Sequence, residues 1–290
     1  MARRDMVIGA CLLASGLLAL TSAVGSAQQQ GGEIRLIVQG DDMGGSHGFN
    51  VGTVKAYQEG ILRATNVLTP APWTSEAVQL LQENPGLDVG VHLTLTGEWT
   101  TMRWRPLTTA PSLVDTNGYL FQGVRSRRGE GEAPGAEEKR ELGEIEKELR
   151  AQIELGKKMV PWVSYMSTHM GFGSLSPEVE AIVQKLSKEY GLVMAGGELG
   201  IERLDRPWDA ADPAEVRAEK LAAMLSSLGP GTWLMIEHCG TDTPEIQALG
   251  RNVAFDRSNV VAAWTHPRVI EAVKKRGIKL TNYRELTGRP

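Results

Sequence analysis

The stretch Ile34-Arg35-Leu36-Ile37-Val38-Gln39-Gly40-Asp41-Asp42-Met43-Gly44 decides the fold class of this chain. Leu36, Ile37 and Val38 are apolar in succession, whereas a strand with one wet face alternates between apolar and polar residues. We therefore expect a strand over residues 34–40 that is covered on both faces, as in a parallel sheet. The strand runs directly into a pair of aspartates.

Six further segments have strand character, and helical patterns lie between them. These expected strands are residues 66–69, 87–95, 163–168, 192–195, 233–237 and 278–281. Strands that alternate with helices are typical of βαβ units and a mostly parallel sheet. We therefore predict an α/β fold in which seven or so βα units curl into a barrel that forms a single domain.

Three of the intervening helices have clear sequence signals. Ser176 and Pro177 predict a helix start, with the helix ending at Gly191. Asp212 and Glu215 have the spacing of a capping box for a second helix, which ends near residue 229. Apolar residues at helical spacing predict a third helix over residues 137–158. The Gly-, Arg- and Glu-rich residues 125–135 before it predict an exposed loop.

Composition and charge exclude one broad class of partner. The chain has 290 residues, 41% of them hydrophobic, and its net charge is -4 with a pI of about 5.8. A nucleic-acid partner would require a strongly basic face, so none is expected. The oligomeric state is not evident from the sequence.

Residues 1–27 have the pattern of a secretory signal peptide. Arg3 and Arg4 precede an uncharged apolar stretch over residues 6–20, and small residues lead to a cleavage site after Ala27. We therefore expect an exported protein, periplasmic or secreted, without stable membrane insertion after cleavage. An uncleaved anchor is the alternative, although the apolar stretch is short for a transmembrane span. The mature chain would keep one cysteine, Cys239, so no intrachain disulfide is expected.

Polar residues that suit catalysis follow or end four of the expected strands. They are Asp41 with Asp42, then His92, His169 and His238. The carboxyl ends of the strands in a parallel barrel meet at one rim, where active sites are built. Taken singly, each residue fits a turn or a hydrogen-bonded core position, but the joint pattern favours a metal site.

The Asp pair suits a hydrolytic metal centre. Adjacent side chains of an extended strand point to opposite sides, so the two carboxylates are expected to do different work. One can bind a metal ion while the other acts as a general base toward water. Two imidazoles and one carboxylate leave coordination positions open, as catalytic sites require. A nearby imidazolium can protonate a departing amine.

At these residues the chain resembles the YdjC-like carbohydrate deacetylase family. The resemblance is carried by residues 37–44, by Leu87-Asp88-Val89-Gly90-Val91-His92-Leu93-Thr94-Leu95-Thr96, by residues 111–115 and by residues 148–154. It implies a distorted (β/α) barrel over residues 33–288. It also implies a hydrolase that removes acetyl groups from an N-acetylated sugar or oligosaccharide.

The resemblance assigns roles to the residues of the site. It implies Asp41 as the general base, with Asp42, His92 and His169 as ligands of one divalent ion, and His238 as a candidate general acid. The ion implied by the resemblance is Mg²⁺, whereas two His and one Asp suit Zn²⁺ by ligand type. The chain departs from the family pattern after His169, where further histidines are missing, and at His238, where Cys239 stands in place of a proline.

Other interpretations of the sequence remain open. Residues 44–48 match the nucleophile-elbow pattern, so Ser46 could serve a serine hydrolase. A non-catalytic sugar-binding protein of the same fold could use some of the seven tryptophans for stacking, although core packing is the expected role. Cys239 is expected to be a buried structural thiol. His266 is expected at the surface, and His47 lies beside the site without an assigned role.

Overall fold

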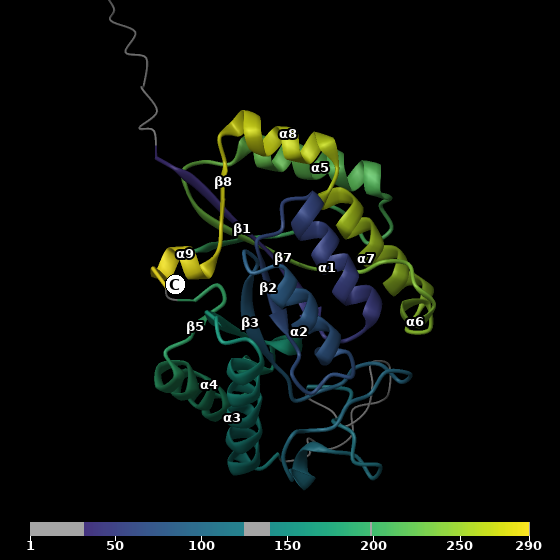
Figure 1. The fold of residues 1–290 in the computed structure, drawn as a ribbon, viewed down its shortest axis with the longest axis vertical. Helices are drawn as coiled ribbons and strands as arrows, with labels where there is room; N and C mark the ends of the chain where they lie inside the picture. Colours follow the sequence, from purple (N-terminus) through teal and green to yellow (C-terminus); the bar gives the residue numbers. More distant parts are fainter. Residues whose placement is uncertain (1–31, 125–139, 198, 290) are drawn as a thin grey trace, which may run out of the picture. The chain divides into compact units, whose positions relative to one another are not determined.

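The computed structural model of the protein describes residues 32–124, 140–197 and 199–289 (Figure 1). β1 (Ile34–Met43) is an inner strand of its sheet and pairs with three other strands. The strands pair in the order β5-β4-β3-β2-β1-β7-β6, and β8 pairs with the first part of β1. The bounds of these strands are β2 (Ala64–Val67), β3 (Asp88–Leu93), β4 (Tyr165–Thr168), β5 (Val193–Met194), β6 (Glu202–Leu204), β7 (Gly231–His238) and β8 (Lys279–Thr281). All of these pairings are parallel, and the sheet curls into a half-barrel, which confirms the predicted α/β fold.

The two faces of the sheet enter different apolar cores, because neighbouring residues of a strand point to opposite sides. Leu36 and Val38 of β1 belong to the larger core, which also contains many of the buried apolar residues of the surrounding helices. Ile37 belongs to a smaller core that contains Tyr165 of β4 and Tyr283, whose rings lie 4.1 Å apart. Coverage of both faces explains why this strand is apolar at successive positions.

Helices surround the sheet and pack against one another (Figure 1). α5 contacts α7 and α8, α1 contacts α2 and α7, and α3 contacts α4. Their bounds are α1 (His47–Glu59), α2 (Thr74–Glu83), α3 (Leu142–Met159), α4 (Pro177–Tyr190), α5 (Ala214–Ser227), α6 (Pro244–Gln247), α7 (Arg251–Trp264), α8 (Pro267–Arg276) and α9 (Tyr283–Thr287). Two short 3₁₀ turns are η1 (Pro111–Leu113) and η2 (His169–Ser174). The described residues from Gly32 onward belong to one compact unit.

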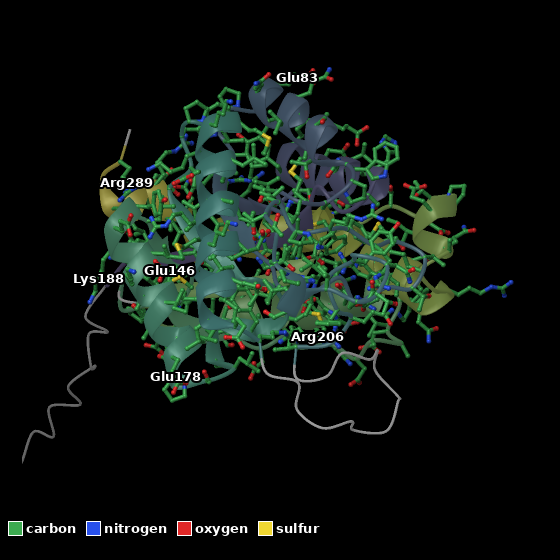
Figure 2. The ribbon with its side chains drawn as sticks, turned by 90° about the horizontal axis from the view of Figure 1, so that it is seen from below. Glu83, Glu146, Glu178, Lys188, Arg206 and Arg289 are labelled. Atoms are coloured by element: carbon green, nitrogen blue, oxygen red, sulfur yellow. The ribbon has the colours of Figure 1, made fainter. Side chains whose placement is uncertain are left out.

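Ion pairs join α3 to α4 on the outside of the molecule. Arg150 of α3 binds Glu189 of α4, and Lys185 of α4 lies 2.7 Å from Glu146 of α3. Figure 2 labels Glu146 and also Lys188, near the end of α4. Exposed ion pairs of this kind stabilise a protein by only about 0–1 kcal/mol each. Both helices also contribute buried apolar residues, such as Leu149 and Val183, to the larger core.

The predicted helix signals have different outcomes. Ser176 caps α4 by accepting a hydrogen bond from the Val179 amide, and Gly191 ends the helix with φ 63°, so both signals are confirmed. The helix predicted over residues 137–158 is observed as α3, but it begins only at Leu142, and residues 137–139 lie outside the described part of the chain. The capping box at Asp212 is wrong: α5 begins at Ala214 with Pro213 at the cap position, and no side chain caps it. The Asp212 carboxylate instead accepts from the Asp209 amide and from Lys220.

One strand was not predicted. β6 has three residues, of which Glu202 and Arg203 are exposed, so no apolar run marks it in the sequence. The predicted signal peptide over residues 1–27 and the predicted loop over residues 125–135 lie outside the described residues. No helix within the described part of the chain is long and apolar enough to cross a membrane.

Candidate active site

The structure brings all five predicted site residues to one rim of the sheet. Asp41 and Asp42 lie near the end of β1, His92 near the end of β3, His169 directly after β4, and His238 at the end of β7. They meet because parallel strands point their carboxyl ends the same way. Asp42, His92 and His169 are buried.

The backbone at the Asp pair departs from an extended strand. Asp42 has φ 73°, and the pairing of β1 with β2 shifts register between Gly40 and Met43, as at a β-bulge. The expectation that the two carboxylates point to opposite sides is therefore wrong at this position. Asp42 Oδ1 lies 3.4 Å and Asp41 Oδ2 lies 3.8 Å from the same atom, Nε2 of His92.

Three possible metal ligands form a small triangle. Asp42 Oδ1 lies 3.2 Å from His169 Nδ1 and 3.4 Å from His92 Nε2, and the two ring nitrogens are 3.3 Å apart. Metal–ligand bonds of about 2.1 Å place neighbouring ligand atoms roughly 3.0–3.4 Å apart in octahedral or tetrahedral geometry. Asp42 Oδ1 is also buried without a hydrogen bond of good geometry. These residues therefore fit a divalent ion.

The other oxygen of Asp42 is bound by an arginine. Arg257 of α7 donates from Nη2 to Asp42 Oδ2 over 2.8 Å, and its guanidinium lies 4.0 Å from the ring centre of Phe49. Burial alone would raise the pKa of Asp42, but the charges of Arg257, His169 and His238 outweigh it and hold this pKa well below its usual value. Asp42 is therefore a carboxylate, as a metal ligand must be.

His169 has a second carboxylate on its far side. Its Nε2 lies 2.8 Å from Oε2 of Glu98, in the segment after β3. Burial opposes the charged ring, but Glu98 and Asp42 together raise the pKa of His169 to about 10. The metal-free ring therefore carries a proton on both nitrogens at neutral pH. A bound cation would replace the Nδ1 proton, while the Nε2–H group would keep its hydrogen bond to Glu98. This is the usual arrangement of a metal-binding histidine that donates its other ring N–H to a carboxylate.

Asp41 is held by one of its two oxygens. Oδ1 accepts hydrogen bonds from Gln39 Nε2 and from Asn66 Nδ2, both over 2.7 Å. Tyr283 fixes Gln39 in turn, because its hydroxyl donates to Gln39 Oε1 over 2.8 Å. These contacts orient the carboxylate and leave Oδ2 directed toward His92 Nε2.

His238 and Cys239 face opposite sides of β7. His238 keeps 44% of its side chain exposed, and its Nε2 lies 3.8 Å from Asp42 Oδ2. Displacement of solvent by the surrounding protein lowers the pKa of His238, Asp42 opposes this effect, and Arg257 adds to it. Cys239 is buried, and burial raises the pKa of its thiol well above the usual value. A buried, protonated thiol agrees with the predicted structural role.

A cavity of about 360 Å³ opens beside these residues. Glu98, His238 and Arg257 form part of its wall and are the residues that contact the ligand triangle. The remaining wall is formed by Trp99, Ala210, Asn252, Val253 and Asp256. An aromatic face therefore lies together with amide and carboxylate groups.

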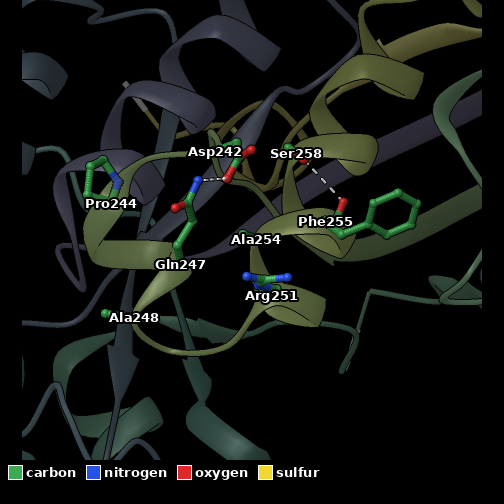
Figure 3. A pocket seen from close by; sticks show the side chains of 8 residues that line it. All are labelled: Asp242, Pro244, Gln247, Ala248, Arg251, Ala254, Phe255 and Ser258. Atoms are coloured by element: carbon green, nitrogen blue, oxygen red, sulfur yellow. Dashed lines mark hydrogen bonds between the residues drawn. The ribbon is translucent and has the colours of Figure 1, made fainter.

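A larger depression of about 690 Å³ lies between α6 and α7 (Figure 3). Gln247 and Asp242 at its edge are joined by a hydrogen bond of 2.9 Å. Its α7 residues, such as Phe255, lie on the helix face opposite Asn252 and Asp256 of the first cavity. None of the predicted site residues lines this depression.

The geometry opposes the serine-hydrolase alternative. Ser46 is fully buried and caps α1, where its Oγ accepts from the Phe49 amide over 3.1 Å. His47 next to it binds Glu76 over 2.7 Å, so these two residues do not form a nucleophile–base pair. His266 caps α8 and lies 3.0 Å from Glu215, at a partly exposed position.

The tryptophans mostly pack inside the protein. Trp104, Trp208 and Trp264 are buried, whereas Trp99 is partly exposed at the cavity and Trp73 keeps 41% of its surface exposed. Core packing was the expected role, and Trp99 alone among the seven lines the cavity beside the metal-ligand triangle.

Three residues of the site were missed in the sequence. Glu98 follows a predicted strand end by a few residues, which is a weak signal. Arg257 lies on the buried face of α7 between Ala254 and Val260, and a charged residue in such a position indicates a buried partner. Asn66 is a polar residue inside a fully buried strand, which also requires a partner.

Comparisons with known proteins identify the family of this chain. The profile of the YdjC-like protein family matches residues 35–275. A carbohydrate deacetylase of Thermus thermophilus is 32% identical over 239 residues, which are 76% of this chain and 82% of that protein. A carbohydrate deacetylase of Geobacillus stearothermophilus is 28% identical, with coverage of 86% and 96% respectively.

A solved structure shares the fold. It belongs to a protein from Enterococcus faecalis described as a candidate for cellobiose-phosphate cleavage, with a TM-score of 0.71 and 24% identity over 88% of this chain and 99% of that one. Together with the match over residues 35–275, these relatives show that the chain belongs to the YdjC-like protein family.

Proposed function

We propose that this protein is a metal-dependent hydrolase that removes acetyl groups from an N-acetylated carbohydrate. The observation that carries the proposal is the buried triangle of Asp42 Oδ1, His92 Nε2 and His169 Nδ1 with a second carboxylate, Asp41, directed at it. The names of the relatives from Thermus thermophilus and Geobacillus stearothermophilus support the choice of reaction.

Asp42, His92 and His169 would hold one divalent ion. When bound, such an ion lowers the pKa of a coordinated water from 15.7 toward about 7 and polarises a carbonyl. Three protein ligands leave positions for water and substrate. Arg257 neutralises the outer oxygen of Asp42 and keeps the inner oxygen turned toward the two rings.

Asp41 acts as the general base. Gln39 and Asn66 fix its Oδ1, so Oδ2 is the oxygen that takes a proton from the attacking water. The water oxygen forms a bond to the acetyl carbonyl carbon, and the amide C–N bond breaks. His238 gives a proton to the departing nitrogen, for which its half-exposed position on the cavity wall is suitable. The products are an amine and acetate.

The sugar ring occupies the cavity of about 360 Å³, a volume within the usual range of small-molecule sites. Trp99 offers an apolar face for the C–H groups of the ring, while Asn252 and Asp256 offer partners for hydroxyl groups. A carbohydrate requires this mixture of an aromatic surface and directed hydrogen bonds.

The test measures metal content and acetate release on the same preparation. The purified protein is expected to contain one divalent ion per chain, to lose acetate release in a chelator, and to regain it with Mg²⁺ or Zn²⁺. The substrates are a panel of N-acetylated mono- and oligosaccharides. Full activity in metal-free protein, or no acetate from any member of the panel with metal restored, would contradict the proposal.

Export is proposed from the charge and apolarity pattern of residues 1–27. The mature protein is expected to begin near Gln28. N-terminal sequencing of protein recovered from the native cell envelope or medium provides the measurement, and an intact Met1 would indicate an uncleaved anchor.

A further inference from the structure

Asn66 lies opposite the bulge that carries the two aspartates. In the parallel pairing of β1 with β2, Gly40 is opposite Thr65 and Met43 is opposite Val67. Asp41 and Asp42 therefore face a single residue of β2, which is Asn66. Its side chain is fully buried.

The amide of Asn66 joins three segments of the site. Its Oδ1 accepts from the Asp42 backbone N–H over 3.2 Å. Its Nδ2 donates to Asp41 Oδ1 and to Ser167 Oγ, both over 2.7 Å. Both amide hydrogens are thus used. The opposite amide orientation would place N–H against N–H at Asp42 and oxygen against oxygen at Asp41, so the chemistry fixes the orientation.

The contact with the Asp42 amide supports an unusual backbone conformation. Asp42 and Met170 are the non-glycine residues with positive φ in the described part of the chain. A left-handed conformation is unfavourable for a residue with a Cβ atom and persists where the surroundings stabilise it. Asn66 stabilises it by binding the N–H that the bulge removes from the regular ladder.

The contact with Ser167 reaches the ring of His92. Ser167 is the register partner of His92 on β4, and its Oγ lies 2.7 Å from His92 Nδ1. With one lone pair of Oγ occupied by Asn66, the other can accept a hydrogen bond from the Nδ1–H group of His92. The ring then carries its hydrogen on Nδ1, and the unprotonated Nε2 faces Asp42 Oδ1.

We propose that Asn66 is the positioning residue of this site: it orients the base Asp41, holds the backbone of Asp42, and through Ser167 keeps the His92 ring in its metal-binding form. The proposal rests on the proposed function, because it concerns the same metal centre. Asn66 itself contacts neither substrate nor metal in this role.

The test compares Asn66→Ala with a matched variant on the same strand. Thr65→Val removes another buried hydrogen bond of β2, from Thr65 Oγ1 to the Gly40 carbonyl over 2.8 Å. Among the described residues, the Thr65 side chain forms no hydrogen bond with Asp41, Asp42 or Ser167. The readouts are the Co²⁺ dissociation constant from a visible-absorption titration, the Co²⁺ absorption spectrum, and kcat and KM for acetate release.

Asn66→Ala is expected to weaken Co²⁺ binding by about 10- to 100-fold, as loss of an outer partner of a metal ligand typically does. It should change the Co²⁺ spectrum and lower kcat more than it raises KM. Thr65→Val is expected to lower the unfolding temperature without changing Co²⁺ affinity. Asn66→Asp keeps the size of the side chain and the acceptor for the Asp42 amide but loses the two N–H donors. It should therefore lower Co²⁺ affinity and kcat. If Asn66 only filled space, this variant would keep both.

Ser167→Ala tests the contact that links Asn66 to His92 through Ser167. Combined with Asn66→Ala, its effect on Co²⁺ affinity is expected to be less than additive, because both changes interrupt the same contact. If the wild-type protein binds Co²⁺ and releases acetate while Asn66→Ala does both equally well, the positioning role alone is refuted. If the wild-type protein binds no divalent ion, the proposed function and this inference are refuted together.

Discussion

Two groups of charged side chains lie side by side at the rim of the sheet and balance their charges in different ways. The first is the ligand cluster, Asp42 with His92 and His169. The second is the arginine cluster, defined by the ion pairs among four residues: Arg206, Arg217, Glu237 and Asp256.

Neighbouring residues are divided between the clusters. On β7, Glu237 belongs to the arginine cluster while the next residue, His238, approaches Asp42. On α7, Asp256 pairs with Arg217 over 2.8 Å while Arg257 pairs with Asp42. Consecutive side chains face different directions on both elements, so each element serves both clusters.

Each carboxylate of the arginine cluster faces a guanidinium group, whereas Asp42 Oδ1 of the ligand cluster faces two imidazole rings. Asp256 Oδ1 also lacks a well-aligned hydrogen bond, but Arg217 Nη2 lies 2.8 Å from it. Arg206 lies 4.0 Å from Glu237 and 3.7 Å from Asp256, so both carboxylates have guanidinium partners. In the ligand cluster, Asp42 Oδ1 faces two imidazole nitrogens without a good hydrogen bond. A buried polar group in that condition is costly unless another group completes it. A cation would complete it, which is why we propose the ligand cluster as the metal site.

Removal of a ring from the ligand cluster should have the largest effect. His92→Ala or His169→Ala is expected to eliminate both bound metal and acetate release, because two of the three ligands cannot hold the ion against water. Elemental analysis and acetate assay of the same preparation provide the measurement. His266→Ala is the matched control, since His266 caps α8 away from the cluster and should keep the metal. If His92→Ala kept its full metal content, His92 would not be a metal ligand, and the contrast between the two clusters would be lost.

Replacement of each aspartate should separate binding from chemistry. Asp41→Asn is expected to leave metal content unchanged and to lower kcat by about 10² to 10⁴, the usual contribution of a general base. Asp42→Asn is expected to weaken metal binding, because the ion loses its charged ligand. Metal titration with steady-state kinetics measures both effects. Loss of metal from Asp41→Asn with retention in Asp42→Asn would reverse the two assignments.

Stability of the arginine cluster should depend on pH. Burial raises the pKa of Glu237 from its ordinary 4.5 to about 7, Arg206 opposes this shift, and Asp256 adds to it. Folded Glu237 therefore keeps its proton where the unfolded chain has released it. The resulting stability is fully present below pH 4.5 and is lost as the pH rises through 7.

Glu237→Gln removes this pH dependence because glutamine does not ionise. Between pH 5 and pH 8, the free energy of unfolding of the wild type should fall relative to that of the variant by about 2 kcal/mol. Urea unfolding of both metal-free proteins at the two pH values gives the difference. A constant difference between wild type and variant would show that Glu237 ionises normally in the folded state.

The smallest effect is expected at Ser46, which lies next to the ligand cluster in sequence but caps α1. Ser46→Ala should destabilise the protein by about 1 kcal/mol through loss of the cap, with acetate release retained. Thermal unfolding and the acetate assay provide the measurement. Loss of turnover without loss of stability would instead favour a serine nucleophile.

Local patterns in the sequence predicted much of the fold because their causes are local. Successive apolar residues in β1 indicated coverage on both faces, and Ser176 with Gly191 marked both ends of α4. Such signals depend on neighbours within a few residues. The same kind of signal gave a wrong prediction at Asp212, which does not cap α5. Pro213 occupies the cap position, and the Asp212 carboxylate binds Lys220 instead.

The sequence by itself determined which chemical groups reach the rim, since a parallel strand delivers whatever residue follows it to the same edge. Asp41, Asp42, His92, His169 and His238 could be named on that ground and by family resemblance. Tertiary structure decided how these groups face one another. Asn66, Glu98 and Arg257 reach the cluster from 24, 71 and 215 residues away along the chain from their partners. No periodicity encodes such distances, because they arise only when the sheet curls and α7 packs against α1.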